Sequence, residues 1–239
     1  MKMLFRILLA MALVTTAASA ADRDMKDKEK QEDRLKNSGV VLGEILNIKD
    51  SIPQDLMDKA KCVVVIPSVV KAAFIVGGSY GRGTVVCRNE KARMGSWGAP
   101  AMMVLEGGSV GFQIGGEATD FVMLIMNDHG VNSLLHSKVK LGGDVSVAAG
   151  PVGRTAEADT DAYVRAEILT YSRARGAFAG VSLEGASLRP DEDANEALYG
   201  RKISASAIVM GASTVTVPPS AHQLIALLDK ASPTSRAHR

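Results

Sequence analysis

The chain has 239 residues, of which 46% are hydrophobic, 23% are charged and 4% are aromatic. These proportions are typical of a globular protein and argue against a disordered, collagen-like or cysteine-rich chain. The formal net charge of +2 falls to zero, 26 basic against 26 acidic residues, when Lys2 and Arg6 are left out with the leader described next. A neutral chain has no global field that attracts nucleic acid, so we expect no nucleic-acid partner.

The first 20 residues have the layout of a secretory signal peptide. Lys2 and Arg6 carry positive charge, residues 4–14 form an apolar run, and Ala18-Ser19-Ala20 supplies small residues for cleavage. The run is shorter than the ~20 residues of a membrane-spanning helix, which argues against the alternative of an uncleaved anchor. We therefore expect cleavage near Ala20-Ala21 and export to the periplasm or the medium, which are oxidising compartments.

Three further segments are predicted after this leader: a charged extension over residues 21–32, one domain over residues 33–230 and a disordered tail over residues 231–239. Charged pairs four residues apart, such as Asp22 and Lys26, favour a solvated helix at the start.

The helix then becomes amphipathic, because apolar residues recur at helical spacing, and we expect it to end near Ser51. The apolar positions are Leu35, Leu42, Ile45 and Leu46. This apolar stripe either packs on the core, which we favour, or lies on a membrane surface. Pro53 is expected to open a short helix that reaches Lys61.

From residue 62 onward, short β-branched runs alternate with glycines. The runs predict strands over 62–66, 71–76, 84–88, 101–105, 109–114, 121–126, 162–171 and 177–183. Glycine pairs, among them Gly77-Gly78 and Gly107-Gly108, are interpreted as turns, and another turn is placed at residues 172–176. Helices are expected near residues 129–136 and over 191–199 and 219–230. The sequence predicts an α+β fold: a single compact domain with an antiparallel, glycine-rich β-sheet or barrel-like core and flanking N- and C-terminal helices.

Two cysteines, Cys62 and Cys87, lie in separate predicted strands. If these strands are neighbours, a disulfide can form and would contribute ~3 kcal/mol in the chain-entropy model. The alternative is a pair of buried free thiols that pack as small apolar side chains.

The sequence contains partial matches to motifs for catalysis and cofactor binding, but the segments around them do not fit those motifs. The pattern G-x-S-x-G occurs around Ser79 and Ser109, but each serine is followed by another predicted strand and not by the helix of a nucleophile elbow. Gly153-Arg154-Thr155 lacks the upstream glycine of a phosphate-binding loop. The histidines do not cluster with each other or with the cysteines, so no metal site is predicted. We expect a protein that is not an enzyme and has no cofactor.

Basic residues gather beside Tyr80 and Trp97, near the first predicted β turns. They are Lys71, Arg82, Arg88, Lys91 and Arg93. They are suited to contact phosphate headgroups with Trp97 at the interface, or they are ordinary solvated charges at a sheet edge.

A series of short blocks in fixed order resembles the SYLF domain family. The blocks are IP at 66–67, GGSYGRG at 77–83, WGAPA at 97–101, GGSVGFQIGG at 107–116, ATD at 118–120, KLGGD at 140–144, AAGPVGR at 148–154, YSR at 171–173 and GVSLEG at 180–185. The resemblance implies a lipid-binding domain, with phosphoinositides as ligands of eukaryotic members and actin as a partner of some fungal members.

The resemblance also implies that lipid contacts come from basic elements near the start of the domain, here Arg34, Lys36 and Lys71, to which the basic group above adds Arg82. We therefore expect an exported, non-catalytic protein that contacts anionic phospholipid headgroups at a membrane surface. The alternative is a periplasmic scaffolding protein that binds a protein partner without lipid recognition. Actin enters only by analogy with the family.

Overall fold

A computed structural model describes residues 2–49, 51–73, 76–88, 96–110, 117–152, 166–174, 177–181, 183–211 and 215–233, and for residues 2–21, 71–73, 76–77, 108–110 and 117 it describes the backbone only. The helices are α1 (Lys2–Leu46), α2 (Gln54–Lys59), α3 (Asp128–His136), α5 (Glu192–Tyr199), α6 (Ala205–Met210), the 3-10 turn η2 (Pro219–Ala221) and α7 (His222–Ala231). The strands are β1 (Cys62–Ala73), β2 (Val76–Cys87), β3 (Ala101–Val110), β4 (Glu117–Ile125), β5 (Val139–Lys140), β6 (Val147–Ala149), β7 (Ile168–Ala174), β8 (Ala177–Gly180) and β9 (Ala186–Pro190).

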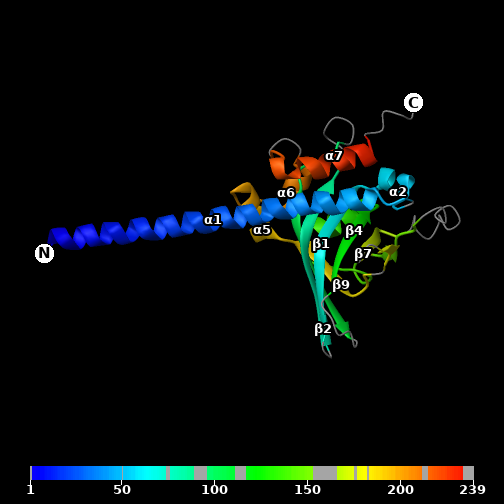
Figure 1. The fold of residues 1–239 in the computed structure, drawn as a ribbon, viewed down its shortest axis with the longest axis horizontal. Helices are drawn as coiled ribbons and strands as arrows, with labels where there is room; N and C mark the ends of the chain where they lie inside the picture. Colours follow the sequence, from blue (N-terminus) through cyan, green and yellow to red (C-terminus); the bar gives the residue numbers. More distant parts are fainter. Residues whose placement is uncertain are drawn as a thin grey trace.

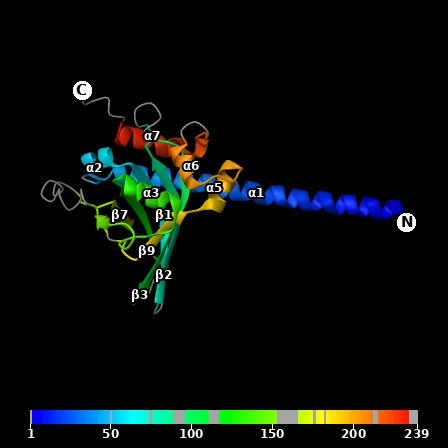
Figure 2. The ribbon, with the colours of Figure 1, turned by 180° about the vertical axis from the view of Figure 1, so that it is seen from behind.

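These strands form one sheet in the order β5-β9-β3-β2-β1-β4-β7-β6, with β8 also paired to β7. The strand pairs are antiparallel apart from β6 and β7, which are parallel, so the sheet is mixed. Figures 1 and 2 show α1 and α7 side by side across the sheet, with α3 and α6 toward the viewer in Figure 2. The predicted α+β fold, a single domain with flanking helices, is confirmed.

Alternate residues of β1 supply two separate cores, as the two-residue period of a strand requires. Val64 and Ile66 pack in a cluster with side chains of α3 and α6, whereas Val63 and Val65 pack with side chains of α1, α2 and α7. The middle of the sheet is therefore covered by helices on both faces.

The apolar stripe of α1 packs on this core, as we favoured. Leu35, Leu42 and Ile45 are fully buried. Gly39 and Gly43 allow α7 to approach closely, because a Cβ at Gly39 would lie 3.3 Å from the Leu224 backbone nitrogen. The helix ends at Leu46 and not near Ser51, and α2 begins after Pro53 as predicted. None of the helices formed by the described residues combines the length and the hydropathy needed to cross a membrane.

The interpretation of the first glycine pairs as turns was wrong. Gly77 and Gly78 lie inside β2, and Gly107 and Gly108 lie inside β3, with Gly78 paired to Gly108. Close approach explains the glycines farther along β2: a Cβ at Gly83 would lie 2.0 Å from the carbonyl oxygen of Val65. That contact occurs at a bulge of β1, where the register shifts between Val65 and Val70.

Several strands and turns begin or end at other residues than predicted. The runs 62–66 and 71–76 belong largely to one bulged strand, β1, which continues through Pro67. The predicted turn at 172–176 is shorter, because β7 continues to Ala174 and pairs there with Ala177 of β8. Strand β9 and helix α6 were not predicted, since their short segments lack a clear period. Residues 162–165, 111–114 and the tail from residue 234 lie outside the described residues.

The cysteine prediction is confirmed. Cys62 and Cys87 are direct partners in the register of β1 and β2, and their sulfur atoms form a disulfide. Both residues are buried in the core that faces α3 and α6.

Candidate functional site

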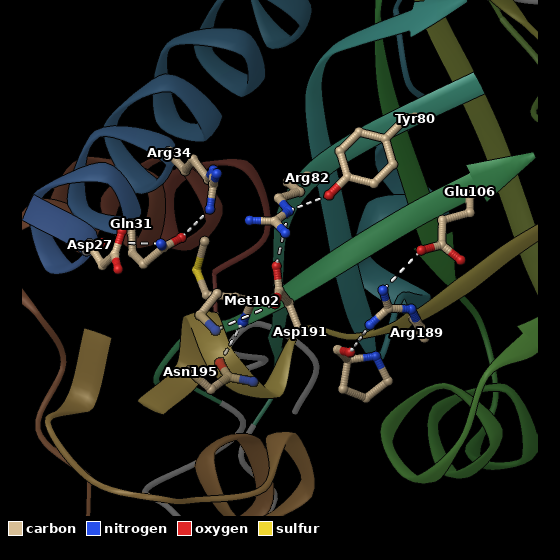
Figure 3. Close-up of polar contacts among 12 residues, drawn as sticks. Asp27, Gln31, Arg34, Tyr80, Arg82, Met102, Glu106, Arg189, Asp191 and Asn195 are labelled. Atoms are coloured by element: carbon tan, nitrogen blue, oxygen red, sulfur yellow. Dashed lines mark hydrogen bonds and ion pairs between the residues drawn. The ribbon is translucent and has the colours of Figure 1, made fainter. Parts of the chain in front are cut away.

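A cluster of polar side chains lies where α1 crosses β2 and the start of α5 (Figure 3). Arg82 of β2 is its centre: Nε lies 3.4 Å from Oδ2 of Asp191 and donates a hydrogen bond to the Tyr80 hydroxyl. The Arg82 guanidinium also lies 5.8 Å from the centre of the Tyr80 ring, within the range of a cation–π contact. Tyr80 and Arg82 share one face of β2 because they are two residues apart.

Asp191 is held in place by its role at the start of α5. Its Oδ1 accepts a hydrogen bond from the backbone N–H of Ala194 at 3.4 Å, and its own N–H donates to the carbonyl of Met102 at 2.9 Å. Asn195, one turn later, accepts a bond from the Met102 N–H at 2.7 Å. A carboxylate at a helix N-terminus is stabilised by the helix dipole, so Asp191 is a fixed, largely buried negative charge.

Arg34 of α1 is the second cation of the cluster. It is half-buried and donates a hydrogen bond to Oε1 of Gln31, and Nε2 of Gln31 donates to the carbonyl of Asp27 at 3.0 Å. Burial lowers the pKa of the Arg34 guanidinium, and the nearby charge of Arg82 lowers it further. Within the described part of the chain, Arg34 forms no ion pair. Arg34 therefore places a second guanidinium near the Arg82–Asp191 ion pair without pairing with Asp191 itself. The other nearby acid, Asp27, pairs with Lys30, so the cluster has a local excess of positive charge.

Neighbouring charges on this side of the sheet are matched. Glu106 of β3 receives hydrogen bonds from Arg189 and Lys138, each at 2.9 Å, and these bonds lower the pKa of the Glu106 carboxyl group. On the other side of β1, Arg173 pairs with both Glu44 of α1 and Asp120 of β4. The excess positive charge is thus localised at Arg34 and Arg82.

The structure brings together two of the four predicted lipid-binding residues. Lys36 is exposed on α1 and pairs with Asp33 at 3.0 Å, which raises the pKa of the Lys36 amine. Lys71 lies in β1 opposite Ser79 and Glu117, and only its backbone is described. Sequence reasoning missed the role of Asp191, which it placed only at the start of a helix. No local signal relates Asp191 to Arg82, more than 100 positions earlier.

Of the remaining basic residues near the first predicted turns, Arg88 is described, and it has a structural role. Arg88 stacks over Trp97 at 4.4 Å and donates from Nε to the carbonyl of Ala60 at 3.0 Å, close to the ends of α2 and α7. Trp97 is buried, which argues against the alternative in which it lies at an interface. Lys91 and Arg93 lie outside the described residues.

The serines of the two G-x-S-x-G motifs lie in strands. Ser79 is inside β2 and pairs with Gly107, and Ser109 lies near the end of β3. Neither position is the strand-to-helix turn that a nucleophile elbow requires. Over the described residues, no group of three or more histidine, cysteine or acidic side chains is placed to hold a metal ion.

Comparison with known proteins finds a matching family profile and several similar proteins of the same family. The family profile described as "Ysc84: Las17-binding protein actin regulator" matches residues 106–231. Protein YSC84 of Saccharomyces cerevisiae is 34% identical over 210 residues, which are 87% of this chain and 44% of the yeast protein. LAS seventeen-binding protein 3 of the same yeast is 33% identical over the same shares. The human SH3 domain-containing YSC84-like protein 1 is 36% identical over 179 residues, which are 74% of this chain and 51% of the human protein. The chain thus spans about half the length of these relatives.

Proposed function

Because the chain belongs to the Ysc84 family, the family of the SYLF domain, we propose that it is a non-catalytic binding protein that attaches to membranes through anionic phospholipid headgroups. The observation that carries this proposal is the excess of positive charge in the cluster: Arg82 pairs with Asp191, and Arg34 beside them forms no ion pair in the described part of the chain.

A phosphate group would complete this arrangement. Guanidinium groups bind phosphate through paired hydrogen bonds. They are also more weakly hydrated than a lysine amine, so less hydration is lost when phosphate binds. The Arg82 side chain retains 38% of its exposure, so a headgroup can reach the cluster from solvent. Since each basic group near an anionic membrane contributes about 1 kcal/mol, binding is expected to be modest and sensitive to salt.

Vesicle co-sedimentation tests the proposal. The purified protein is mixed with vesicles of phosphatidylcholine alone, or with added phosphatidylserine or a phosphoinositide, at low and high salt. We expect salt-sensitive binding to the anionic vesicles only. Absence of binding to every composition would contradict the proposal.

Two variants of α1 test the residues. Arg34→Gln and Lys36→Gln each remove one positive charge, two positions apart on the same helix. We expect Arg34→Gln to weaken binding about fivefold, because it removes the unpaired cation. Lys36→Gln is expected to change binding less than about twofold, because Asp33 already neutralises that amine. Equal effects would mean that net charge alone matters.

The names of the relatives favour a second candidate function, which is binding to a protein of the actin machinery. A groove of 370 Å³ is suited to a peptide, since its walls are partly apolar; it is lined by Lys28, Glu32, Leu198, Tyr199, Arg201 and residues 215–219. Co-sedimentation with actin filaments tests this candidate. Val217→Asp, which places a charge in the groove, should abolish filament binding and leave vesicle binding intact.

Export remains a proposal of its own. It is supported by the charge, the apolar run and the small residues of the first 20 positions, and by the disulfide, which persists in oxidising compartments. Mass spectrometry of the protein expressed with its full sequence tests it: a mature chain that begins at Ala21 is expected, and a chain that retains residues 1–20 would contradict export by cleavage.

A further inference from the structure

The ends of the four central strands include two stretches that carry no charged residue. No charged residue occurs between Lys71 and Arg82, or between Glu106 and Glu117. Strand pairing brings these two stretches together, because β2 pairs with β3 from Val76↔Val110 onward, and β1 pairs with β4 up to Lys71↔Glu117. In Figures 1 and 2 the ends of β2 and β3 project away from the helices.

Two large exposed side chains mark the start of this region. Val70 and Tyr80 are 53% and 46% exposed, and they are direct partners across β1 and β2. Ala118, the partner of Val70 on β4, is also exposed. Tyr80 contacts Arg82, so the apolar pair lies beside the arginine cluster (Figure 3).

We propose that this end of the sheet, defined by Val70, Tyr80 and Ala118, is the surface that docks on the membrane, with Arg34 and Arg82 at the level of the phosphates. The inference rests on the proposed function and specifies its orientation. Tyrosine suits the membrane interface because its ring is apolar and its hydroxyl is polar. Lys71 and Glu117 are direct register partners of opposite charge, one position nearer the strand ends than Val70 and Ala118, and beyond them neither stretch carries a charge.

The described side chains of α1 fit a membrane surface less well. Residues 22–30 are exposed, and Met25 is the large apolar side chain among them. Two of its lysines pair with acids: Lys26 with Asp22, and Lys30 with Asp27. A helix that lies on a membrane surface needs an apolar face, and this segment offers only Met25.

Four serine variants of nearly equal exposure test the orientation by vesicle co-sedimentation. Val70→Ser and Tyr80→Ser change the proposed surface, whereas Val40→Ser on α1 and Met210→Ser on α6 change side chains that are 45% and 47% exposed elsewhere. We expect the first two to weaken binding to anionic vesicles about fivefold, and the controls to stay within about twofold. Urea unfolding of each variant shows whether the fold is retained.

A second measurement reports contact directly. Tryptophan is placed at position 70 or, as the control, at position 40, in a Trp97→Phe background, and vesicles contain phospholipid brominated along its acyl chains. Quenching of Val70→Trp but not of Val40→Trp is expected. The reverse pattern, or loss of binding in Val40→Ser, would overturn the inference in favour of α1.

The outcomes separate this inference from the proposed function. If the wild-type protein binds no vesicle, the proposed function fails. If Arg34→Gln weakens binding while Val70→Ser and Tyr80→Ser do not, headgroup recognition stands and the orientation is wrong. If light scattering shows that Tyr80→Ser converts a dimer into a monomer with vesicle binding unchanged, this end of the sheet joins two copies of the chain, which also overturns the inference.

Discussion

The β1–β2 pair is packed under helices along one half of its length and open along the other. In the covered half, Val63, Val65 and Val86 are buried against α1, α2 and α7. In the open half, Val70 and Tyr80 keep about half of their surface in solvent although the same two strands remain paired beyond the bulge of β1. Backbone pairing therefore maintains the strands throughout. Side-chain burial separates a half that stabilises the fold from a half whose side chains remain in contact with solvent.

The largest expected effect comes from one substitution made in both halves of β2. Gly83→Ala should destabilise the protein by about 3 kcal/mol or more, because its Cβ would lie 2.0 Å from the Val65 carbonyl oxygen. Gly78→Ala should change stability little, because its Cβ would meet Gly107 at an ordinary 3.6 Å. Urea denaturation measures both variants, and similar losses would contradict the division into two halves.

The disulfide lies at the covered end of the pair. Replacing both cysteines, as Cys62→Ala with Cys87→Ala, should lower the free energy of unfolding by ~3 kcal/mol in the chain-entropy model. The reducing agent dithiothreitol should destabilise the wild-type protein and leave the double variant unchanged. A wild-type protein that is equally stable when fully reduced would show that the strand pairing needs no cross-link.

A matched pair of valines in β1 gives a smaller and sharper comparison. Val65→Ala should cost about 2 kcal/mol, since the side chain is 1% exposed and its loss leaves a cavity. Val70→Ala should stay within about 0.5 kcal/mol, as is usual for an exposed position. Urea unfolding midpoints test the pair; a large loss at Val70 would mean that this position belongs to the stabilising half.

The smallest effect concerns pH at Glu106, which lies at the border of the two halves. The hydrogen bonds from Arg189 and Lys138 lower the pKa of this carboxyl group in the folded protein, so its stabilisation is present above the unfolded pKa of ~4.3 and is lost as the pH falls through the folded value. Wild-type protein should be more stable than Glu106→Gln at neutral pH, and this difference should disappear in acid. Urea midpoints across pH measure it; a constant difference would argue against the ion pairs.

Local patterns in the sequence predicted much of the secondary structure. The helical spacing of Leu35, Leu42 and Ile45 predicted the buried stripe of α1, and β-branched runs predicted most of the described strands, because these periods follow from backbone geometry. The glycines of β2 misled the same reasoning. Glycine is common in turns, but at Gly83 it is required by the close approach of another strand, which no local pattern reports.

The sequence by itself determined the α+β class, the family, the pair of cysteines and the basic residues from which the site is drawn. Only the tertiary structure decided which of those basic residues lack an acidic partner. Lys36 has Asp33 within its own helix, but Arg34 meets Arg82 and Asp191 only where α1, β2 and α5 converge. Charge balance depends on distance in space, and contacts between positions 34, 82 and 191 are set by packing and not by sequence spacing.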